Sequence, residues 1–198
     1  MRPDRDPVAA RSDDDPPPAV VHGDGPADAV HLGVDGGGSP AGRSRSIDVI
    51  LKALDGGRAG DILVIDDHGR TDQACIGDLV ALEARSAGLG GIVVHGCHRD
   101  STQIEAIALP VFSLGAQPHG ARSADPRPPD PFAHCQLGDV TVYPGDIIVG
   151  DADGVVVIAA HDAADVLRAA EKVAKQEAAQ RRLVGEGETL RSQFAFDD

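Results

Sequence analysis

Aromatic residues are scarce in this sequence: its 198 residues include no tryptophan, one tyrosine and four phenylalanines. A hydrophobic core must therefore rest on Val, Ile, Leu and Ala, which fits an overall hydrophobic content of 41%. A chain of this length suggests one domain of ordinary size with room for a real core.

Long hydrophobic runs are also missing. No apolar stretch approaches the roughly 20 residues that a membrane-spanning helix needs, and the opening MRPDRD lacks the apolar stretch of a signal peptide. The three cysteines, Cys75, Cys97 and Cys135, are odd in number and widely spaced, which disfavours a disulfide framework. We therefore expect a cytoplasmic protein with reduced thiols and no membrane partner.

Positive charge is in short supply. The chain has 18 Lys and Arg against 32 Asp and Glu, a net charge of −14. Electrostatic repulsion makes nucleic acid an unfavourable partner for such a chain. An anionic small substrate would need a local cationic pocket, so individual arginines become the residues to inspect.

The first 46 residues differ in composition from the rest. They contain seven of the 14 prolines, seven glycines, eight aspartates and no aromatic residue. Such a segment cannot bury enough apolar surface to offset the entropy that it loses on ordering. We predict that 1–46 is a largely disordered acidic, Pro- and Gly-rich segment, in which 29–34 could form a short strand. Residues 47–198 are predicted to form the folded domain.

Regular hydrophobic patterning begins at Ile47. Helical spacing, short apolar runs and Gly or Pro punctuation divide the remaining chain into helices, strands and turns. In chain order the pattern predicts a helix at 47–54, a buried strand at 61–65, a polar turn at 66–70, a helix at about 76–87, a buried strand at 91–94, a short helix near Ile104, a strand at 110–112, a proline-rich loop at 115–131, strands at 140–142, 147–149 and 155–158, and a helix from Asp162, as its cap, to about 183. This order is typical of an α/β protein with a mixed, partly antiparallel sheet.

Two element ends carry residues suited to a binding site. Gly77 and Asp78 open the helix at 76–87, where backbone N–H groups and the helix dipole can hold a carboxylate. Arg99 and Asp100 follow the strand at 91–94, at the carboxyl edge where α/β folds commonly place ligands. Twenty residues separate Asp78 from Arg99, enough for one helix and one strand. The crossover would therefore bring both ends to the same side of the sheet.

A purely structural interpretation of these residues is also open. An Arg-Asp pair at a strand end is most often a surface ion pair that contributes little. Asp78 could be an early-helix carboxylate favoured by the helix dipole. Spacing alone does not choose between the two interpretations.

Longer motifs add a family resemblance. The segments that carry it are GDILVID at 60–66, GD at 77–78, GGIVVHGCHRD at 90–100, VYPGDIIV at 142–149, DADGVVV at 151–157 and GETL at 187–190. Together, over about residues 47–196, they resemble the signatures of the RraA-like family. That family includes aldolases acting on 4-hydroxy-4-methyl-2-oxoglutarate and 4-carboxy-4-hydroxy-2-oxoadipate, and the ribonuclease E regulators named RraA.

The resemblance implies a fold and an activity. The fold would be a compact α/β/α arrangement around a small central β-barrel, assembled as homotrimers or hexamers. The activity would be that of a divalent-metal-dependent (class II) aldolase, a lyase that releases pyruvate from 4-hydroxy-2-oxo acids and also decarboxylates oxaloacetate. Both reactions pass through pyruvate enolate, whose developing charge must be stabilised. The alternative is a non-catalytic RraA-type regulator that binds a ribonuclease or another protein partner.

The resemblance also implies roles for residues of this sequence. Asp100 would ligate the metal, Mg²⁺ or Mn²⁺, because such an ion can keep several waters and needs few protein ligands. Arg99 would bind the 2-oxo acid substrate and stabilise the enolate oxygen. Glu188 would be a catalytic acid supplied across a subunit interface. Asp78, also in a catalytic position, would form the substrate-binding turn with its neighbours Gly77, Leu79 and Val80. In the family the N-terminal region is ordered, so 1–46 is a departure from its pattern.

Two other chemistries are disfavoured. A Schiff base needs an activated lysine, and the only lysines, Lys52, Lys172 and Lys175, fall on predicted helices without a sign of burial. A zinc site at His95, Cys97 and His98 has suitable side chains. However, successive residues at a strand end point in opposite directions, so three such close neighbours rarely converge on one ion.

Overall fold

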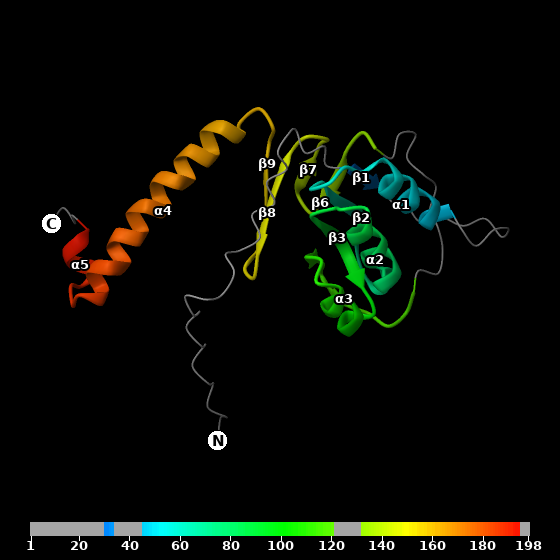
Figure 1. The fold of residues 1–198 in the computed structure, drawn as a ribbon, viewed down its shortest axis with the longest axis horizontal. Coiled ribbons are helices and arrows are strands. Elements are labelled where there is room, and N and C mark those ends of the chain that lie inside the picture. The colour runs from blue at the N-terminus through cyan, green and yellow to red at the C-terminus, as the bar shows by residue number, and fades with distance from the viewer. Residues whose placement is uncertain (1–29, 34–44, 121–131, 195–198) are drawn as a thin grey trace, which may run out of the picture.

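The computed structural model describes residues 30–33, 45–120 and 132–194 (Figure 1). The predicted disorder of 1–46 therefore falls almost entirely outside the described residues. Within that segment, Val30–Gly33 form strand β1, inside the range where the sequence allowed a short strand.

The central sheet is parallel. Its order is β1, β2 (Ile62–Ile76), β3 (Gly91–His98) and β4 (Val111–Phe112), with β5 (Gly115–Ala116) paired to the end of β3. All of its strand pairs run parallel. The predicted mixed sheet is wrong in this respect, because the antiparallel pairs belong to separate small sheets.

Two hairpins supply those antiparallel pairs. One joins β6 (Cys135–Leu137) to β7 (Val140–Val142), and the other joins β8 (Ile147–Asp151) to β9 (Gly154–Ile158). Each forms a two-stranded sheet of its own. Within the described ranges no sheet closes on itself, so the small β-barrel implied by the resemblance is not shown.

Five helices accompany the strands. They are α1 (Arg45–Gly56), α2 (Asp78–Ser86), α3 (Ser101–Ile107), α4 (Ala163–Gly185) and α5 (Leu190–Gln193). In the described parts of the chain, no helix is both long enough and apolar enough to cross a membrane.

The two faces of the sheet bury different partners. Leu63 and Ile65 of β2 pack with residues of α1 and α2 in one core cluster. The alternate residues, Ile62 and Val64, pack with Cys135 and other hairpin residues in a second cluster. This follows from the two-residue period of a strand, which sends successive side chains to opposite faces. The layers are therefore helices, sheet and hairpins, rather than the expected α/β/α.

Strand β2 is much longer than the sequence predicted. The polar residues 66–70, expected as a turn, lie inside it, and the pairing with β3 shifts register between Asp66 and Arg70 and again between Arg70 and Ala74. His68 and Gly69 have positive φ angles of 54° and 66°, and His68 N donates to Asp66 Oδ1 over 2.7 Å. Residues 66–70 do turn as predicted, but the turn forms a bulge within a strand that continues to Ile76.

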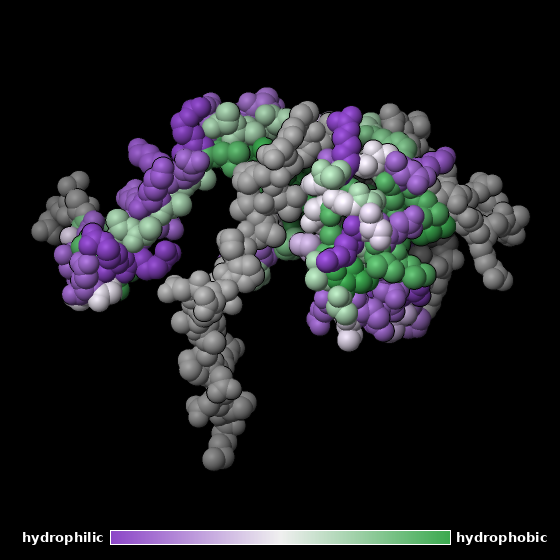
Figure 2. Space-filling view, in the orientation of Figure 1, coloured by the Kyte–Doolittle hydropathy of each residue, from purple (hydrophilic) through white to green (hydrophobic). Residues whose placement is uncertain are grey.

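Helix α4 extends away from the sheet, at the orange end of the chain (Figure 1). None of its 23 residues is buried, and hydrophilic side chains cover much of what is visible of it (Figure 2). Asp162 occupies the cap position as predicted, but its side chain makes no cap hydrogen bond. Its Oδ2 instead lies 3.4 Å from His161 Nε2.

The central strand should dominate stability. Ile92 on β3 has no exposed surface, so Ile92→Ala removes three buried carbons and leaves a cavity. We expect it to lower the free energy of unfolding by about 2–5 kcal/mol, measured by urea denaturation. Leu82→Ala, at a side chain 49% exposed on α2, is the control and should cost less than about 1 kcal/mol. Equal losses in both variants would contradict this description of the core.

Candidate active site

Helix α2 begins with backbone groups facing the sheet edge. Gly77 is its N-cap residue, with an extended backbone (φ −141°, ψ −167°) and no side chain to cap the helix. Leu79 N donates to Asp78 Oδ1 over 2.8 Å, and Asp78 N lies 3.4 Å from Asp100 Oδ2. The first turn thus presents backbone N–H groups to a carboxylate, which is how helix N-termini hold anions.

The Arg99–Asp100 pair forms a corner between β3 and α3. Arg99 N donates to Ile76 O over 3.0 Å, which extends the β2–β3 ladder by one hydrogen bond. Asp100 then adopts a left-handed conformation (φ 61°, ψ 39°), and α3 starts at the next residue. Among non-glycine residues, Asp and Asn tolerate this conformation best. The corner directs the chain out of the sheet directly beside the start of α2.

The two ends meet at Gly77, which is buried. A Cβ atom at this position would lie 2.5 Å from Asp100 Oδ2 and 2.9 Å from Arg99 Nε. Real Cβ atoms essentially never come so close to other heavy atoms, so a side chain at residue 77 would displace the side chains of Asp100 and Arg99. Arg99 Nε is 3.4 Å from Asp100 Oδ2, and the two side chains are 48% and 36% exposed. The structure therefore brings Gly77, Asp78, Arg99 and Asp100 together at a surface accessible to a small ligand.

Other residues singled out from the sequence lie differently. Val80 is 7% exposed and packs in the core, so only its backbone can face a ligand. Leu79 is 73% exposed beside the site. Glu188 is exposed in the connection between α4 and α5, far across the molecule from α3 (Figure 1). Within one chain, Glu188 is not part of this cluster.

Asp100 fits a sparsely ligated metal ion. Across the described ranges no group of three or more His, Cys, Asp and Glu residues could hold a metal. An ion held by Asp100 would therefore have at most two such side-chain ligands and would fill its other positions with water or substrate oxygens. Mg²⁺ tolerates such coordination, whereas a structural zinc site needs four protein ligands.

The alternative zinc site does not assemble. His98 lies between the hydroxyl groups of Ser113 and Ser101, at 2.7 and 2.8 Å. His95 Nδ1 instead lies 3.1 Å from Asp66 Oδ1, and Cys97 is buried.

A second polar cluster was missed by the sequence analysis. The bulge in β2 places Asp67 against Gly96 of β3, where Asp67 is 2% exposed. Its Oδ1 accepts from Arg70 Nη2 over 2.5 Å, whereas its Oδ2 is buried without a hydrogen-bond partner in the described structure. Burial raises the pKa of Asp67, and this outweighs the opposing effect of Arg70. Burial, with the nearby Asp67 charge, also raises the pKa of Cys75 to about 12, so this thiol is not a nucleophile.

The segment after β5, which the sequence predicts as part of a loop, borders the site. His119 O accepts from Ala74 N over 2.6 Å, and Gly120 forms a parallel bridge with Ala74. A Cβ atom at Gly120 would lie 3.2 Å from Arg99 Nη1. The lack of a side chain there gives the guanidinium its space, and no pattern in the sequence indicated this contact.

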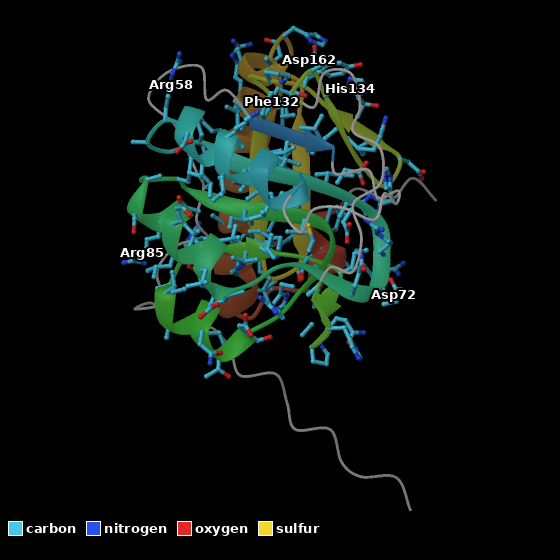
Figure 3. All side chains as sticks on the ribbon, turned by 90° about the vertical axis from the view of Figure 1, so that its right-hand side faces the viewer. Arg58, Asp72, Arg85, Phe132, His134 and Asp162 are labelled. Atoms are coloured by element: carbon cyan, nitrogen blue, oxygen red, sulfur yellow. The ribbon has the colours of Figure 1, made fainter. Side chains whose placement is uncertain are left out.

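Helices α2 and α3 are tied together on their outer side. Arg85, at the outer edge of the molecule in Figure 3, donates from Nη1 to the carbonyl oxygens of Ile107 and Ala108, the latter over 2.9 Å. These carbonyls lie at the end of α3, where a cation also interacts favourably with the helix dipole. This contact joins α2 and α3, whose N-terminal ends border the site.

The site is thus a helix start beside a guanidinium and a carboxylate, at the carboxyl edge of a parallel sheet. The family model described as RraA-like, Aldolase/RraA, matches residues 26–157. Because that match spans well over half of the chain, the protein belongs to the RraA-like family, and the resemblance noted from the motifs is confirmed. The match begins ahead of β1 and includes the whole central sheet.

Relatives with names point toward aldolases. A protein of Halalkalibacterium halodurans provisionally named 4-hydroxy-4-methyl-2-oxoglutarate aldolase is 34% identical over 137 residues, covering 69% of this chain and 64% of that protein. A protein of Aromatoleum aromaticum with the same provisional name is 38% identical over 109 residues, covering 55% and 67%. The chain therefore spans just under two thirds of the length of the first of these relatives.

Solved structures point to a shared fold and to another function. RraAS2 of Streptomyces coelicolor, described as an unusual member of the RNase ES inhibitor RraA protein family, has a TM-score of 0.61 at 28% identity and is covered over 70% of each chain. A protein of Pseudomonas syringae pv. tomato has a TM-score of 0.67 at 24% identity, covering 81% of this chain and 71% of that one. At that identity, the second likeness shows the fold alone.

The buried Asp67 should make stability depend on pH. Its raised pKa means that the folded state binds this proton more tightly than the unfolded chain does, so the carboxyl lowers stability as pH rises through and above its unfolded pKa. Asp67→Asn cannot titrate. Its stability relative to wild type should therefore increase as the pH rises from about 4, measured by urea unfolding.

Asp72→Asn is the matched control for that experiment. Asp72 is exposed on the outer half of β2 (Figure 3), so its replacement should leave the pH profile parallel to that of the wild type. A difference between Asp67→Asn and wild type that stays constant across the pH range would contradict the assignment of a raised pKa to Asp67.

Proposed function

We propose that this protein is a divalent-metal-dependent lyase that releases pyruvate from 4-hydroxy-2-oxo acids such as 4-hydroxy-4-methyl-2-oxoglutarate, and that also decarboxylates oxaloacetate. The observation that carries the proposal is the convergence at Gly77, where the first turn of α2 meets Arg99 and Asp100. The provisional aldolase names of the relatives support the same reaction class.

Each part of the site has a task in this reaction. The carboxylate of a 2-oxo acid is an anion, and it could replace the Asp78 carboxylate as the acceptor for Leu79 N–H at the start of α2. The planar guanidinium of Arg99 can donate two hydrogen bonds to the 2-oxo group or the carboxylate. A divalent cation held by Asp100 would act as a Lewis acid toward the 2-oxo oxygen.

Bond cleavage then places charge where Arg99 can act. In the retro-aldol step the bond between C3 and C4 breaks and its electron pair moves into the enolate of pyruvate, while the 4-hydroxyl group loses its proton. Protonation of C3 completes the reaction. Oxaloacetate reaches the same enolate by losing CO₂. A fixed guanidinium beside the enolate oxygen stabilises the charge as it develops, and such groups often supply the largest single effect in catalysis.

Removing the guanidinium should remove turnover. We expect Arg99→Ala to reduce kcat more than ~100-fold, and Asp100→Ala or EDTA to abolish metal-dependent release of pyruvate. The measurement is NADH loss coupled through lactate dehydrogenase, with Mg²⁺ and oxaloacetate or 4-hydroxy-4-methyl-2-oxoglutarate. Arg168→Ala, at an exposed arginine on α4, is the control and should retain full activity.

The same assay addresses the alternative. The likeness to RraAS2 favours a regulatory protein that binds a ribonuclease or another protein partner. If wild-type protein with Mg²⁺ or Mn²⁺ releases no pyruvate above background, the lyase proposal is wrong and the regulatory function becomes the better one.

We also propose a homotrimeric or hexameric assembly, in which α4 packs on a neighbouring copy. Val166, Val173 and Val184 are 41%, 52% and 45% exposed. Their spacing places them on one face of the helix, and no residue of α4 is buried within its own chain. A neighbouring copy could cover this stripe. The same contact could bring Glu188, which follows α4, to the site of another subunit.

The stripe can be tested through the mass of the assembly. We expect wild-type protein to elute as a trimer or hexamer in size-exclusion chromatography with light scattering. Val173→Glu places a charge in the stripe and should shift the protein to smaller species. Ala178→Glu adds the same charge on nearly the opposite face of α4 and should not. A wild-type protein that is monomeric at micromolar concentration would contradict the assembly.

A further inference from the structure

His98 connects three segments around the Arg99–Asp100 pair. It is the last residue of β3, directly before the pair. Its ring Nε2 lies 2.8 Å from Ser101 Oγ, at the start of α3, and its Nδ1 lies 2.7 Å from Ser113 Oγ, between β4 and β5. One of these hydrogen bonds therefore spans the two residues that carry the candidate chemistry, and the other anchors the ring to the neighbouring strands.

The directions of these hydrogen bonds are consistent with one ring tautomer. Ser113 Oγ donates to Gly115 O over 3.2 Å and accepts from Gly115 N over 3.2 Å. With the Ser113 proton in the bond to Gly115 O, the hydroxyl accepts from His98 and the ring proton lies on Nδ1. Nε2 is then the acceptor for the hydroxyl proton of Ser101. Both ring nitrogens and both hydroxyl groups are satisfied in this arrangement.

The corner between these anchors has reason to need them. Asp100 is in the left-handed region, which is unfavourable for a side-chain-bearing residue. The side chains of Arg99 and Asp100 are 48% and 36% exposed, so packing restrains them only in part. Backbone hydrogen bonds from Arg99 N to Ile76 O and from Gln117 N to His98 O hold the entry to the corner. The bond from His98 to Ser101 is a side-chain link from the entry to the exit.

We propose that His98 is a positioning residue that fixes the geometry of Arg99 and Asp100 by bridging the ends of their dipeptide. This role rests on the proposed function, because it is defined by the work of those two residues. His98 touches neither substrate nor metal in this scheme and acts through Ser101 and Ser113. Small displacements of positioned groups are costly, since misplacement by about 1 Å can reduce rates about 100-fold.

Three variants separate the effects of the two His98 hydrogen bonds, one to Ser101 and the other to Ser113; each bond is an arm of the bridge. His98→Leu keeps the bulk and removes both hydrogen bonds, and we expect it to lower kcat about 10- to 100-fold. The amide of His98→Gln reaches the position of Nε2 and keeps the arm to Ser101, so it should recover most of kcat. The amide of His98→Asn reaches the position of Nδ1, keeps only the arm to Ser113 and should recover less. His161→Ala, at an exposed histidine, is the control and should match the wild type.

A measurement that does not need activity separates this proposal from the proposed function. In hydrogen exchange with mass spectrometry, peptides covering residues 99–104 should exchange about tenfold faster in His98→Leu, while peptides from α1 and β2 keep their wild-type rates. If wild type is inactive but this local effect is found, the lyase function fails and the positioning of the corner by His98 stands. Unchanged exchange at 99–104, or faster exchange throughout the domain, would overturn the proposal. So would a His98→Leu variant with full kcat.

Discussion

The close approach at Gly77 is the constraint on which the site depends. Parallel pairing of β2 with β3 continues to Ile76 and His98, and the bond from Arg99 N to Ile76 O extends it by one step. Directly after the ladder, Gly77 lies beside Arg99 and Asp100. A side chain at residue 77 would occupy the position of the Asp100 carboxylate. The position of the Asp100 carboxylate beside the start of α2 therefore depends on the missing Cβ of Gly77.

The bulges of β2 follow from the same pairing. β2 has 15 residues and pairs with the eight residues of β3, so the surplus must leave the ladder. It leaves at the polar residues between Asp66 and Arg70 and again before Ala74. The first bulge folds Asp67 and Arg70 back into the protein, where they pair with each other. This ion pair lies in the strand that leads to Gly77, and its carboxyl carries the cost of burial.

Local patterning was enough to predict the parts of the fold that local physics determines. The start of α2 beside Gly77, the strand at 91–94 and the crossover between them follow from apolar period and glycine punctuation, and the family motifs lie on them. The layer arrangement did not follow, because alternating residues of β2 meet helices on one face and hairpins from distant sequence on the other. The length of β2 did not follow either, since polar residues are typical of a turn and only the pairing with β3 keeps them within a strand.

In the site, too, some features follow from local sequence and others from the packing of distant segments. Arg99 and Asp100 could be selected from the sequence because charged residues after a buried strand fall at a sheet edge. The residues around them also include Gly120 and the serines that bond His98, which have no distinctive pattern in the sequence. Contacts of this kind arise from the packing of separate segments, so no local rule predicts them. Together with Gly77, Gly120 leaves room for the Arg99 guanidinium beside the start of α2, in a protein of net charge −14. An anionic ligand approaching such a protein meets repulsion at long range, and at close range it needs Arg99 and the N–H groups of α2 aligned together. The acidic surface thus makes the fixed geometry of this corner more important for binding, whether the ligand is a substrate or an acidic segment of a partner.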